Sequence, residues 1–173
     1  VVVATKAVVY RNKEWHTPER VVASLDNSLR LMGTDHVDVF QLHGILPGEE
    51  YRYSLETLGP ALLEQKAKGK IRHIGLSEVD VDELREAQQV TAIASVQNMY
   101  NLSVRQSEPL LDVATAEGIG FIPWFPLAAG PLAAADGPLQ RIAAEHGASA
   151  SQLALAWLLK RSPAMLPIPG TSK

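Results

Sequence analysis

The stretch VDVFQLHG, residues 37–44, carries the clearest signal for a fold in this chain. Val39, Phe40 and Leu42 make it apolar at positions that point to both faces of a strand, which is typical of a parallel sheet covered by helices. His43 and a glycine then follow, so the pattern places an imidazole at the carboxyl end of a buried strand. What this imidazole does depends on which residues follow the other strands.

Five further apolar runs have the same β-rich character. They are VVVAT (1–5), IRHIGL (71–76), IASVQN (93–98), IGFIPW (119–124) and AMLPIP (164–169). The segments between these runs have helical spacing and residues that begin or end helices.

Three of these helices have clear signals at their ends. Thr17-Pro18 predicts the start of a helix that Gly33 ends. Asp80 with Glu83 and Ser149 with Gln152 have the spacing of capping boxes. The apolar stripe expected on the first helix consists of Val22, Leu25, Leu29 and Met32.

Strands that alternate with helices indicate the α/β class with a parallel sheet. A doubly wound sheet is not favoured, because the first strand ends in ATKA without a G-x-G-x-x-G turn. A (β/α)8 barrel fits better, although such a barrel typically needs about 250 residues. We therefore expect residues 1–173 to form a single partial barrel domain with about six βα units, the third to eighth strands. The apolar start at Val1 leads us to expect further sequence upstream.

The composition excludes several classes of function. A net charge of −3 and a pI of about 6.0 offer no basic surface for nucleic acid or an anionic membrane. No apolar run approaches the roughly 18 residues of a membrane-spanning helix. The chain has no cysteine, which excludes disulfides and thiolate chemistry and is compatible with the cytoplasmic location that we expect.

Polar or aromatic residues follow every predicted strand. In barrels of this type the chemistry occurs at the carboxyl ends of the strands. The residues there are Lys6, His43, Ser77-Glu78, Gln97-Asn98, Trp124 and the segment Gly170 to Lys173. The other four histidines, at positions 16, 36, 73 and 146, lie elsewhere and are interpreted as structural.

Three other chemistries lack their patterns. A metal site is not predicted, because no H-x-H occurs and Glu78 is the nearest carboxylate to His43 in the predicted ring. A serine nucleophile would need a G-x-S-x-G turn, and a phosphate-binding loop would need GxxxxGK[ST]; neither is present.

The motifs at these strand ends resemble those of the aldo-keto reductases. The matching stretches are VVVATK (1–6), LMGTDHVDVFQLHG (31–44), GKIRHIGLSE (69–78), SVQNMYN (95–101), IGFIPWFPLAAG (119–130), SQLALAWLLKR (151–161) and LPIPGTS (166–172). They occur in the family's order and cover nearly the whole chain.

The resemblance implies reversible hydride transfer between a nicotinamide, usually NADPH, and an aldehyde or ketone. Lys6 and His43 match two members of the family's catalytic tetrad, whose other members are an aspartate and a tyrosine. The lysine lowers the pKa of the tyrosine that protonates the alkoxide, and the histidine donates a hydrogen bond to the carbonyl oxygen.

The resemblance also implies the residues that bind NADP(H). Ser77, Glu78 and Gln97 correspond to the group on the carboxamide, and Trp124 to the aromatic ring that stacks on the nicotinamide. The pyrophosphate segment corresponds to Phe125, Pro126, Leu127 and Gly130. The site for the 2′-phosphate corresponds to Gly170, Thr171, Ser172 and Lys173.

Two departures from the family pattern accompany this resemblance. Glu78 stands where many relatives have asparagine. The tetrad's aspartate and tyrosine are expected before Val1, because none of the tyrosines at positions 10, 51, 53 and 100 lies in the family's motif. Residues 1–173 alone are therefore not expected to be active.

A non-catalytic nicotinamide-binding subunit of the same fold, resembling potassium-channel β subunits, remains the alternative, as does an unrelated barrel. The resemblance predicts neither a particular carbonyl substrate nor an oligomeric state.

Overall fold

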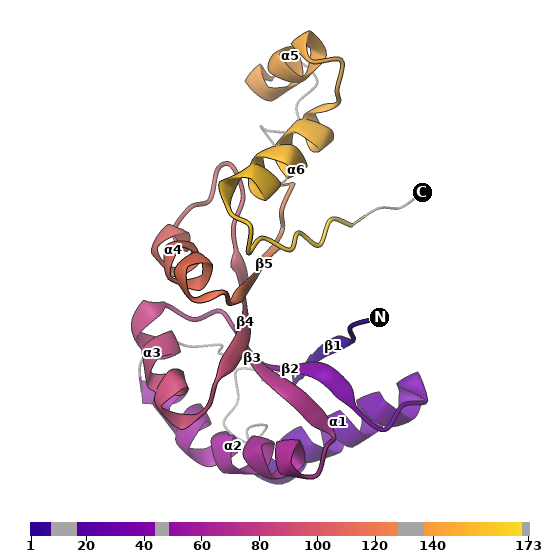
Figure 1. The fold of residues 1–173 in the computed structure, drawn as a ribbon, viewed down its shortest axis with the longest axis vertical. Coiled ribbons are helices and arrows are strands. Elements are labelled where there is room, and N and C mark those ends of the chain that lie inside the picture. Colours follow the sequence, from indigo (N-terminus) through magenta and orange to yellow (C-terminus); the bar gives the residue numbers. More distant parts are fainter. Residues whose placement is uncertain (8–16, 44–48, 128–136, 171–173) are drawn as a thin grey trace. The chain divides into compact units, whose positions relative to one another are not determined.

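The computed structural model describes residues 1–7, 17–43, 49–127 and 137–170, and the side chains of all of these except 49–54. Strands and helices alternate through most of the chain (Figure 1). In order they are β1 Ala4–Ala7, α1 Pro18–Met32, β2 Val37–His43, α2 Glu49–Ala67, β3 Ile71–Ser77, α3 Val81–Val90, β4 Ile93–Met99, α4 Glu108–Glu117, β5 Gly120–Trp124, α5 Pro138–Glu145 and α6 Ala150–Arg161.

The sheet has the strand order of a barrel. Its strands follow one another as β1-β2-β3-β4-β5, and the register of β1 with β2 and of β2 with β3 is parallel. A doubly wound sheet reverses its strand order at a switch point, and this order has no reversal. The predicted α/β class with a parallel sheet is therefore confirmed.

The chain forms two compact units, Val1–Val96 and Gln97–Lys173, with the boundary inside β4. In the first unit, α1, α2 and α3 lie on one side of the strands (Figure 1). Its largest fully buried side chains include Leu25 of α1, Phe40 of β2 and Leu84 of α3. In the second unit, Tyr100 and Phe121 are fully buried.

Two predicted strands differ from the observed ones. The first begins at Ala4, and Val1 and Val2 are exposed, so Lys6 lies within β1 and not after it. The run AMLPIP (164–169) forms no strand in the described residues; it makes one isolated parallel bridge, Phe121 to Met165. Two prolines in this run lack the N–H that a longer ladder would need. The described sheet therefore has five strands where six were predicted.

The helix ends follow the sequence closely. Thr17 caps α1 through its side chain, and Gly33 ends that helix with a left-handed φ of 65°. Asp80 and Glu83 form both hydrogen bonds of a capping box, at 2.8 and 2.9 Å. The predicted stripe of α1 is wrong by one residue at its start, because Val21 is buried and Val22 is only half-buried. Met32 is exposed.

A glycine in β3 allows close contact between three strands. The side chain of Gln41 in β2 donates from Nε2 to Ser95 Oγ in β4, at 3.4 Å, and both residues are buried. β3 lies between them in the sheet, and its residue beside Gln41 is Gly75. A Cβ at position 75 would lie 2.4 Å from Ser95 Oγ and 3.0 Å from Gln41 Cγ. Gly75 therefore leaves the space through which Gln41 reaches Ser95.

We expect Gly75→Ala to lower the free energy of unfolding by about 1–3 kcal/mol, because the new methyl group overpacks this contact. Thermal or urea unfolding measures the change. Gly170→Ala is the control, since nothing lies within 4 Å of a Cβ there. Adding Ser95→Ala should restore part of the loss, because it removes the nearest atom. An unchanged unfolding midpoint for Gly75→Ala would contradict this account.

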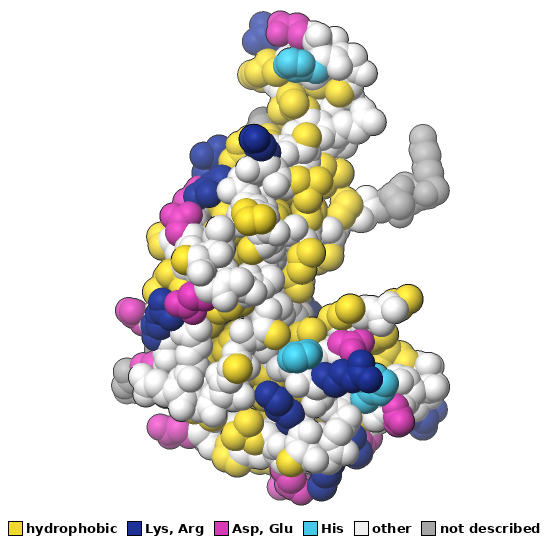
Figure 2. Space-filling model, in the orientation of Figure 1, with side chains coloured by type: hydrophobic (Ala, Val, Ile, Leu, Met, Phe, Trp, Pro, Cys, Tyr) yellow, Lys and Arg dark blue, Asp and Glu magenta, His cyan; other side chains and the backbone are white. Residues whose placement is uncertain are grey.

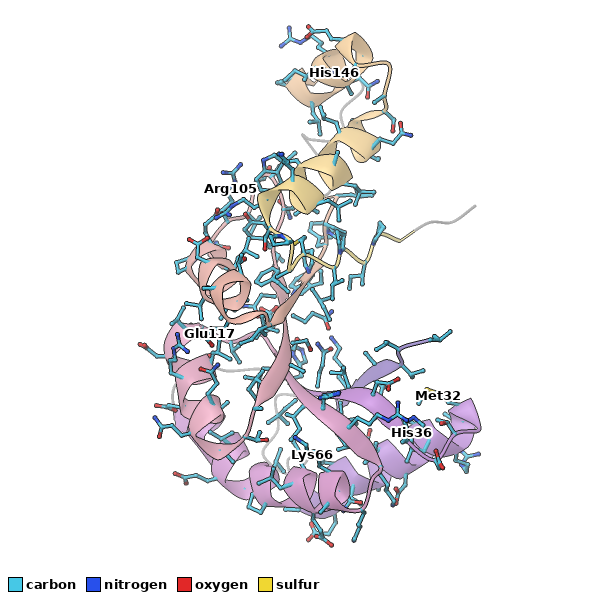
Figure 3. The ribbon with its side chains drawn as sticks, viewed as in Figure 1. Met32, His36, Lys66, Arg105, Glu117 and His146 are labelled. Atoms are coloured by element: carbon cyan, nitrogen blue, oxygen red, sulfur yellow. The ribbon has the colours of Figure 1, made fainter. Side chains whose placement is uncertain are left out.

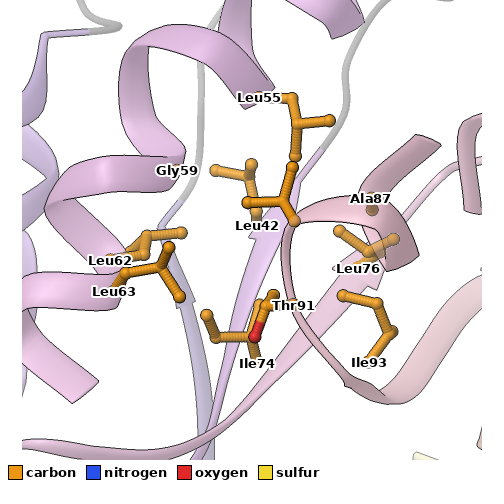
Figure 4. Close-up of a pocket in the computed structure, with 11 residues that line it drawn as sticks. Leu42, Leu55, Gly59, Leu62, Leu63, Ile74, Leu76, Ala87, Thr91 and Ile93 are labelled. Carbon is orange, nitrogen blue, oxygen red and sulfur yellow. The ribbon is translucent and has the colours of Figure 1, made fainter. Parts of the chain in front are cut away.

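A small apolar cavity lies on the helix side of the sheet in the first unit (Figure 4). Its lining includes Leu62 of α2, Ile74 and Leu76 of β3 and Ile93 of β4. The hydroxyl of Thr91 is the one polar side-chain group among its lining residues. The lining offers no titratable group, so we interpret the cavity as a gap in packing.

The surface carries charges of both signs. On the face shown in Figure 2, basic and acidic side chains are interspersed without a continuous patch of either sign. Two of the histidines interpreted as structural, His36 and His146, lie at the periphery (Figure 3); His36 Nδ1 is 2.6 Å from Asp35 Oδ1. Among the described residues, no helix is long and apolar enough to cross a membrane.

Candidate active site

The register of three strands places the predicted catalytic residues on one face of the sheet. Lys6 of β1 pairs with Gln41 of β2, and His43 pairs with Ser77 of β3. Side chains two residues apart on a strand point to the same face, so Gln41 and His43 share a face. Lys6, His43 and Ser77 therefore lie together near the carboxyl ends of adjacent strands, as the sequence predicts.

His43 has the electrostatic environment of a neutral imidazole. The pKa of His43 is lowered from its usual 6.5, first by burial and then by the positive charge of Lys6. The Ser77 backbone beside the ring and the charge of Glu78 oppose this shift without cancelling it. Its Nδ1 is buried and has no hydrogen-bond partner among the described residues. A neutral imidazole carries one N–H donor and one acceptor, so it can bind a neutral carbonyl.

Ser77 is the last residue of β3, and Glu78 begins the bend that follows the strand. Ser77 is 1% exposed, and its Oγ has no partner within the described part of the chain. Glu78 has a φ of 57°, in the left-handed region that few residues other than glycine adopt. A buried hydroxyl normally has a hydrogen-bond partner, so Ser77 fits a position that a bound polar group completes. This fits the carboxamide of a nicotinamide.

The remaining described candidates lie in the second unit. Gln97 lies within β4 and is 9% exposed. Trp124 is the last residue of β5 and is half-buried, with its ring 6.2 Å from the exposed ring of Phe125. Phe125 has a left-handed φ of 58°. Pro126 is buried and Leu127 half-buried.

Several predicted residues fall outside the described part of the chain. These are Gly130, Thr171, Ser172 and Lys173, so the predicted phosphate contacts stay predictions. Gly170 is described and exposed. Tyr10 and the side chains of Tyr51 and Tyr53 also lie outside the description.

Tyr100 does not have the environment of a catalytic acid. It is completely buried, and its hydroxyl donates to Glu108 Oε2 at 2.6 Å. Burial and the neighbouring carboxylate raise the pKa of Tyr100 far above its usual value of 10.0. A catalytic tyrosine needs the opposite shift. This agrees with the prediction that the tetrad tyrosine is not Tyr100.

Three residues near these strand ends were not predicted from the sequence to make buried contacts. Gln41 lies between the apolar residues Phe40 and Leu42, which was a usable signal for a buried polar contact. Ser95 and Asn101 gave no local signal, because their partners are 54 and 24 residues away in the chain. Among the described residues, no group of three or more histidine or carboxylate side chains could hold a metal ion.

The uninterrupted parallel order, with polar side chains at the carboxyl ends of its strands, defines a protein of the (β/α)8-barrel class. The family model for the aldo/keto reductase family matches residues 1–173, and the chain belongs to this family. Both the predicted family and the predicted fold class are thereby confirmed.

Individual relatives agree with this family. An uncharacterized oxidoreductase of Schizosaccharomyces pombe is 41% identical over 178 residues, which cover 100% of this chain and 57% of that protein. Pyridoxine 4-dehydrogenase of Escherichia coli is 36% identical over 159 residues, covering 90% of this chain and 55% of the enzyme. The chain thus spans little more than half the length of these curated relatives.

Solved structures show the same architecture. An aldo/keto reductase from Klebsiella pneumoniae, crystallised with NADP and acetate, is 30% identical, with a TM-score of 0.78. The match covers 99% of this chain and 60% of that one.

Proposed function

We propose that the protein reduces an aldehyde or ketone to an alcohol with NADPH as the hydride donor. The observation that carries this proposal is the grouping of Lys6, His43 and Ser77 on one face of the sheet, where two buried polar atoms lack partners among the described residues. The NADP complex of the Klebsiella relative supports the choice of cofactor.

The residues of the first unit have distinct roles in this reaction. When bound, NADPH supplies the hydride. The neutral imidazole of His43 donates a hydrogen bond to the carbonyl oxygen, which orients it and stabilises its growing negative charge. The ammonium of Lys6 lowers the pKa of the acid that protonates this oxygen. That acid is a tyrosine in the family pattern, and it is not Tyr100.

The proposal also names the residues that would hold the cofactor. Ser77, Glu78 and Gln97 would hold the carboxamide, with Glu78 accepting from its NH2 group. Trp124 would stack on the nicotinamide. The segment from Phe125 through Pro126 and Leu127 to Gly130 would lie along the pyrophosphate. The 2′-phosphate would be bound by Gly170, Thr171, Ser172 and Lys173, whose hydroxyls and cation suit a phosphate.

The same proposal covers the substrate class, the location and the partners of the protein. The substrate is a small-molecule carbonyl compound, and the location is the cytoplasm. Neither nucleic acid nor a membrane is a partner. The net charge of −3 supports this view of its partners.

The test of the proposal is a cofactor and substrate assay on the full-length protein. We expect NADPH to quench tryptophan fluorescence, and a panel of aldehydes and ketones to include compounds whose reduction consumes NADPH. Binding of NADPH without turnover of any carbonyl would contradict catalysis and favour a nicotinamide-binding subunit. Absence of NADPH binding would contradict the proposal as a whole.

We expect Trp124→Ala to abolish most of the NADPH-dependent quenching and to weaken NADPH binding about threefold to tenfold, because it removes one aromatic stacking partner. Fluorescence titration measures both effects. Trp157→Phe is the control, since the Trp157 ring already stacks on Tyr100 at 5.8 Å and lies under Arg105 at 4.5 Å. Unchanged quenching and affinity in Trp124→Ala would contradict the stacking role.

A further inference from the structure

The turn after β5 has a backbone conformation that its own sequence does not favour. Among the described residues, Glu78 and Phe125 are the non-glycine residues with positive φ, at 57° and 58°. Each directly follows the last residue of a strand, Ser77 of β3 or Trp124 of β5. A bulky side chain is rare in this region, and such strain persists only where the surroundings hold it.

Phe125 is held from the turn that follows β4. Asn101, which is fully buried, donates from Nδ2 to the Phe125 carbonyl oxygen at 3.1 Å. The backbone N–H of Tyr100 faces the Trp124 carbonyl oxygen at 3.5 Å. Two consecutive residues after β4 therefore contact the two consecutive carbonyls at the end of β5.

The orientation of the Asn101 amide is fixed by its other partners. Its Oδ1 accepts from the N–H groups of Ser103 at 2.9 Å and Val104 at 3.0 Å. A flipped amide would place its NH2 group against two donors and its oxygen against the Phe125 carbonyl. The side chain thus has a single favourable arrangement, and in it the NH2 group faces Phe125.

From this geometry we infer that Asn101 is a positioning residue for cofactor binding, which acts by holding the Trp124–Phe125 turn in its left-handed conformation. This inference rests on the proposed function, in which Trp124 stacks on the nicotinamide. Asn101 is hydrogen-bonded to the protein through both ends of its amide, so it acts through the turn and not by touching the cofactor. Without it, Phe125 would relax toward negative φ, and binding would have to restore the turn.

The first test is Asn101→Asp, which keeps the shape and the acceptor for Ser103 and Val104 but replaces the donor by an oxygen. We expect NADPH to bind about tenfold more weakly, while kcat at saturating NADPH changes by no more than a few-fold. Should the buried charge prevent folding, Asn101→Ser carries the same expectation, because a hydroxyl can accept from the turn but cannot reach Phe125.

A second substitution distinguishes positioning from general destabilisation. Glycine adopts positive φ without steric cost. Adding Phe125→Gly to Asn101→Asp should therefore make NADPH bind at least about threefold more tightly than to Asn101→Asp alone. The matched control is Thr115→Val, which removes a hydrogen bond to the Leu111 carbonyl at 2.7 Å elsewhere in the second unit. It should lower Tm without weakening NADPH binding.

A readout without cofactor separates this inference from the proposed function. The protein is labelled with 5-fluorotryptophan, and the 19F resonance of Trp124 is assigned by its loss in Trp124→Phe. This resonance should shift in Asn101→Asp. It should return to its wild-type position when Phe125→Gly is added. If the wild-type protein fails to bind NADPH, the proposed function is wrong. If the Trp124 resonance does not shift in Asn101→Asp, the positioning role is wrong, whatever the result with NADPH. The inference is also overturned if Asn101→Asp binds NADPH as tightly as Thr115→Val, or if Phe125→Gly restores nothing.

Discussion

Replacing Lys6 by methionine in the full-length protein is expected to lower kcat for carbonyl reduction by about 10²- to 10⁴-fold, the usual contribution of general acid catalysis. Affinity for NADPH should change by no more than a few-fold, since the proposed role of Lys6 is to lower the pKa of the proton donor and not to bind the cofactor. The loss should therefore appear in the chemical step. Steady-state kinetics with an aldehyde, together with fluorescence titration of NADPH, separate the two effects.

The same substitution has a second expected effect, on His43. The positive charge of Lys6 is one cause of the lowered pKa of His43, after burial. Its removal should raise that pKa toward the usual 6.5, while burial still keeps it lower. An NMR titration of the His43 ring measures this shift, so the contact between the two residues is tested apart from activity.

Lys70→Met is the matched control for Lys6→Met. Lys70 belongs to the same unit, but it precedes β3 and its Nζ pairs with Asp26 Oδ1 at 2.6 Å. This control should leave kcat and the pKa of His43 unchanged. Near-normal turnover of an aldehyde by Lys6→Met would refute the catalytic role of Lys6.

The second large effect is expected for the stability of the second unit, in Tyr100→Ala. The buried ring of Tyr100 stacks on Trp157 at 5.8 Å and meets Phe121 edge to face at 5.6 Å. Removing so large a buried side chain costs about 3–5 kcal/mol. For a chain of this size, that corresponds to a decrease in Tm on the order of 10 °C. Thermal and urea unfolding measure the loss.

Tyr100→Phe separates the ring from its hydroxyl. Glu108 accepts from Tyr100 and from Arg161, whose Nε is 2.5 Å from Glu108 Oε1. The phenylalanine variant keeps the ring and leaves Arg161 in place, so we expect a loss of only about 1–2 kcal/mol. Equal losses in the two variants would contradict the view that ring packing dominates.

Glu108 adds a dependence on pH. Burial by itself would raise its pKa, but the hydrogen bonds from Tyr100 and Arg161 outweigh burial and hold the pKa below the usual 4.5. A carboxyl group with a lowered pKa stabilises the fold above its unfolded pKa, and this contribution is lost as pH falls through the folded pKa. Tyr100→Phe should therefore lose less stability on acidification below pH 4.5 than the wild type.

Short-range signals predicted much of this protein correctly. The boundaries of α1, the capping box at Asp80 and the strand around Phe40 all follow from residues within a few positions of one another. The placement of His43 at the end of β2 follows in the same way. Helix caps and burial patterns depend on neighbours one turn or one pleat away, so a single sequence contains them.

Other features depend on partners distant in the chain. AMLPIP has the composition of a strand, yet only Met165 forms a bridge. Gln41 reaches Ser95 because Gly75 leaves space for it, and Phe125 keeps its left-handed φ where Asn101 holds its carbonyl. The sequence by itself determined the α/β alternation and the helix ends, and it predicted Lys6 and His43 as site residues. The tertiary structure decided which strands pair and which buried amides hold the turns, because these contacts join residues 24 to 54 positions apart.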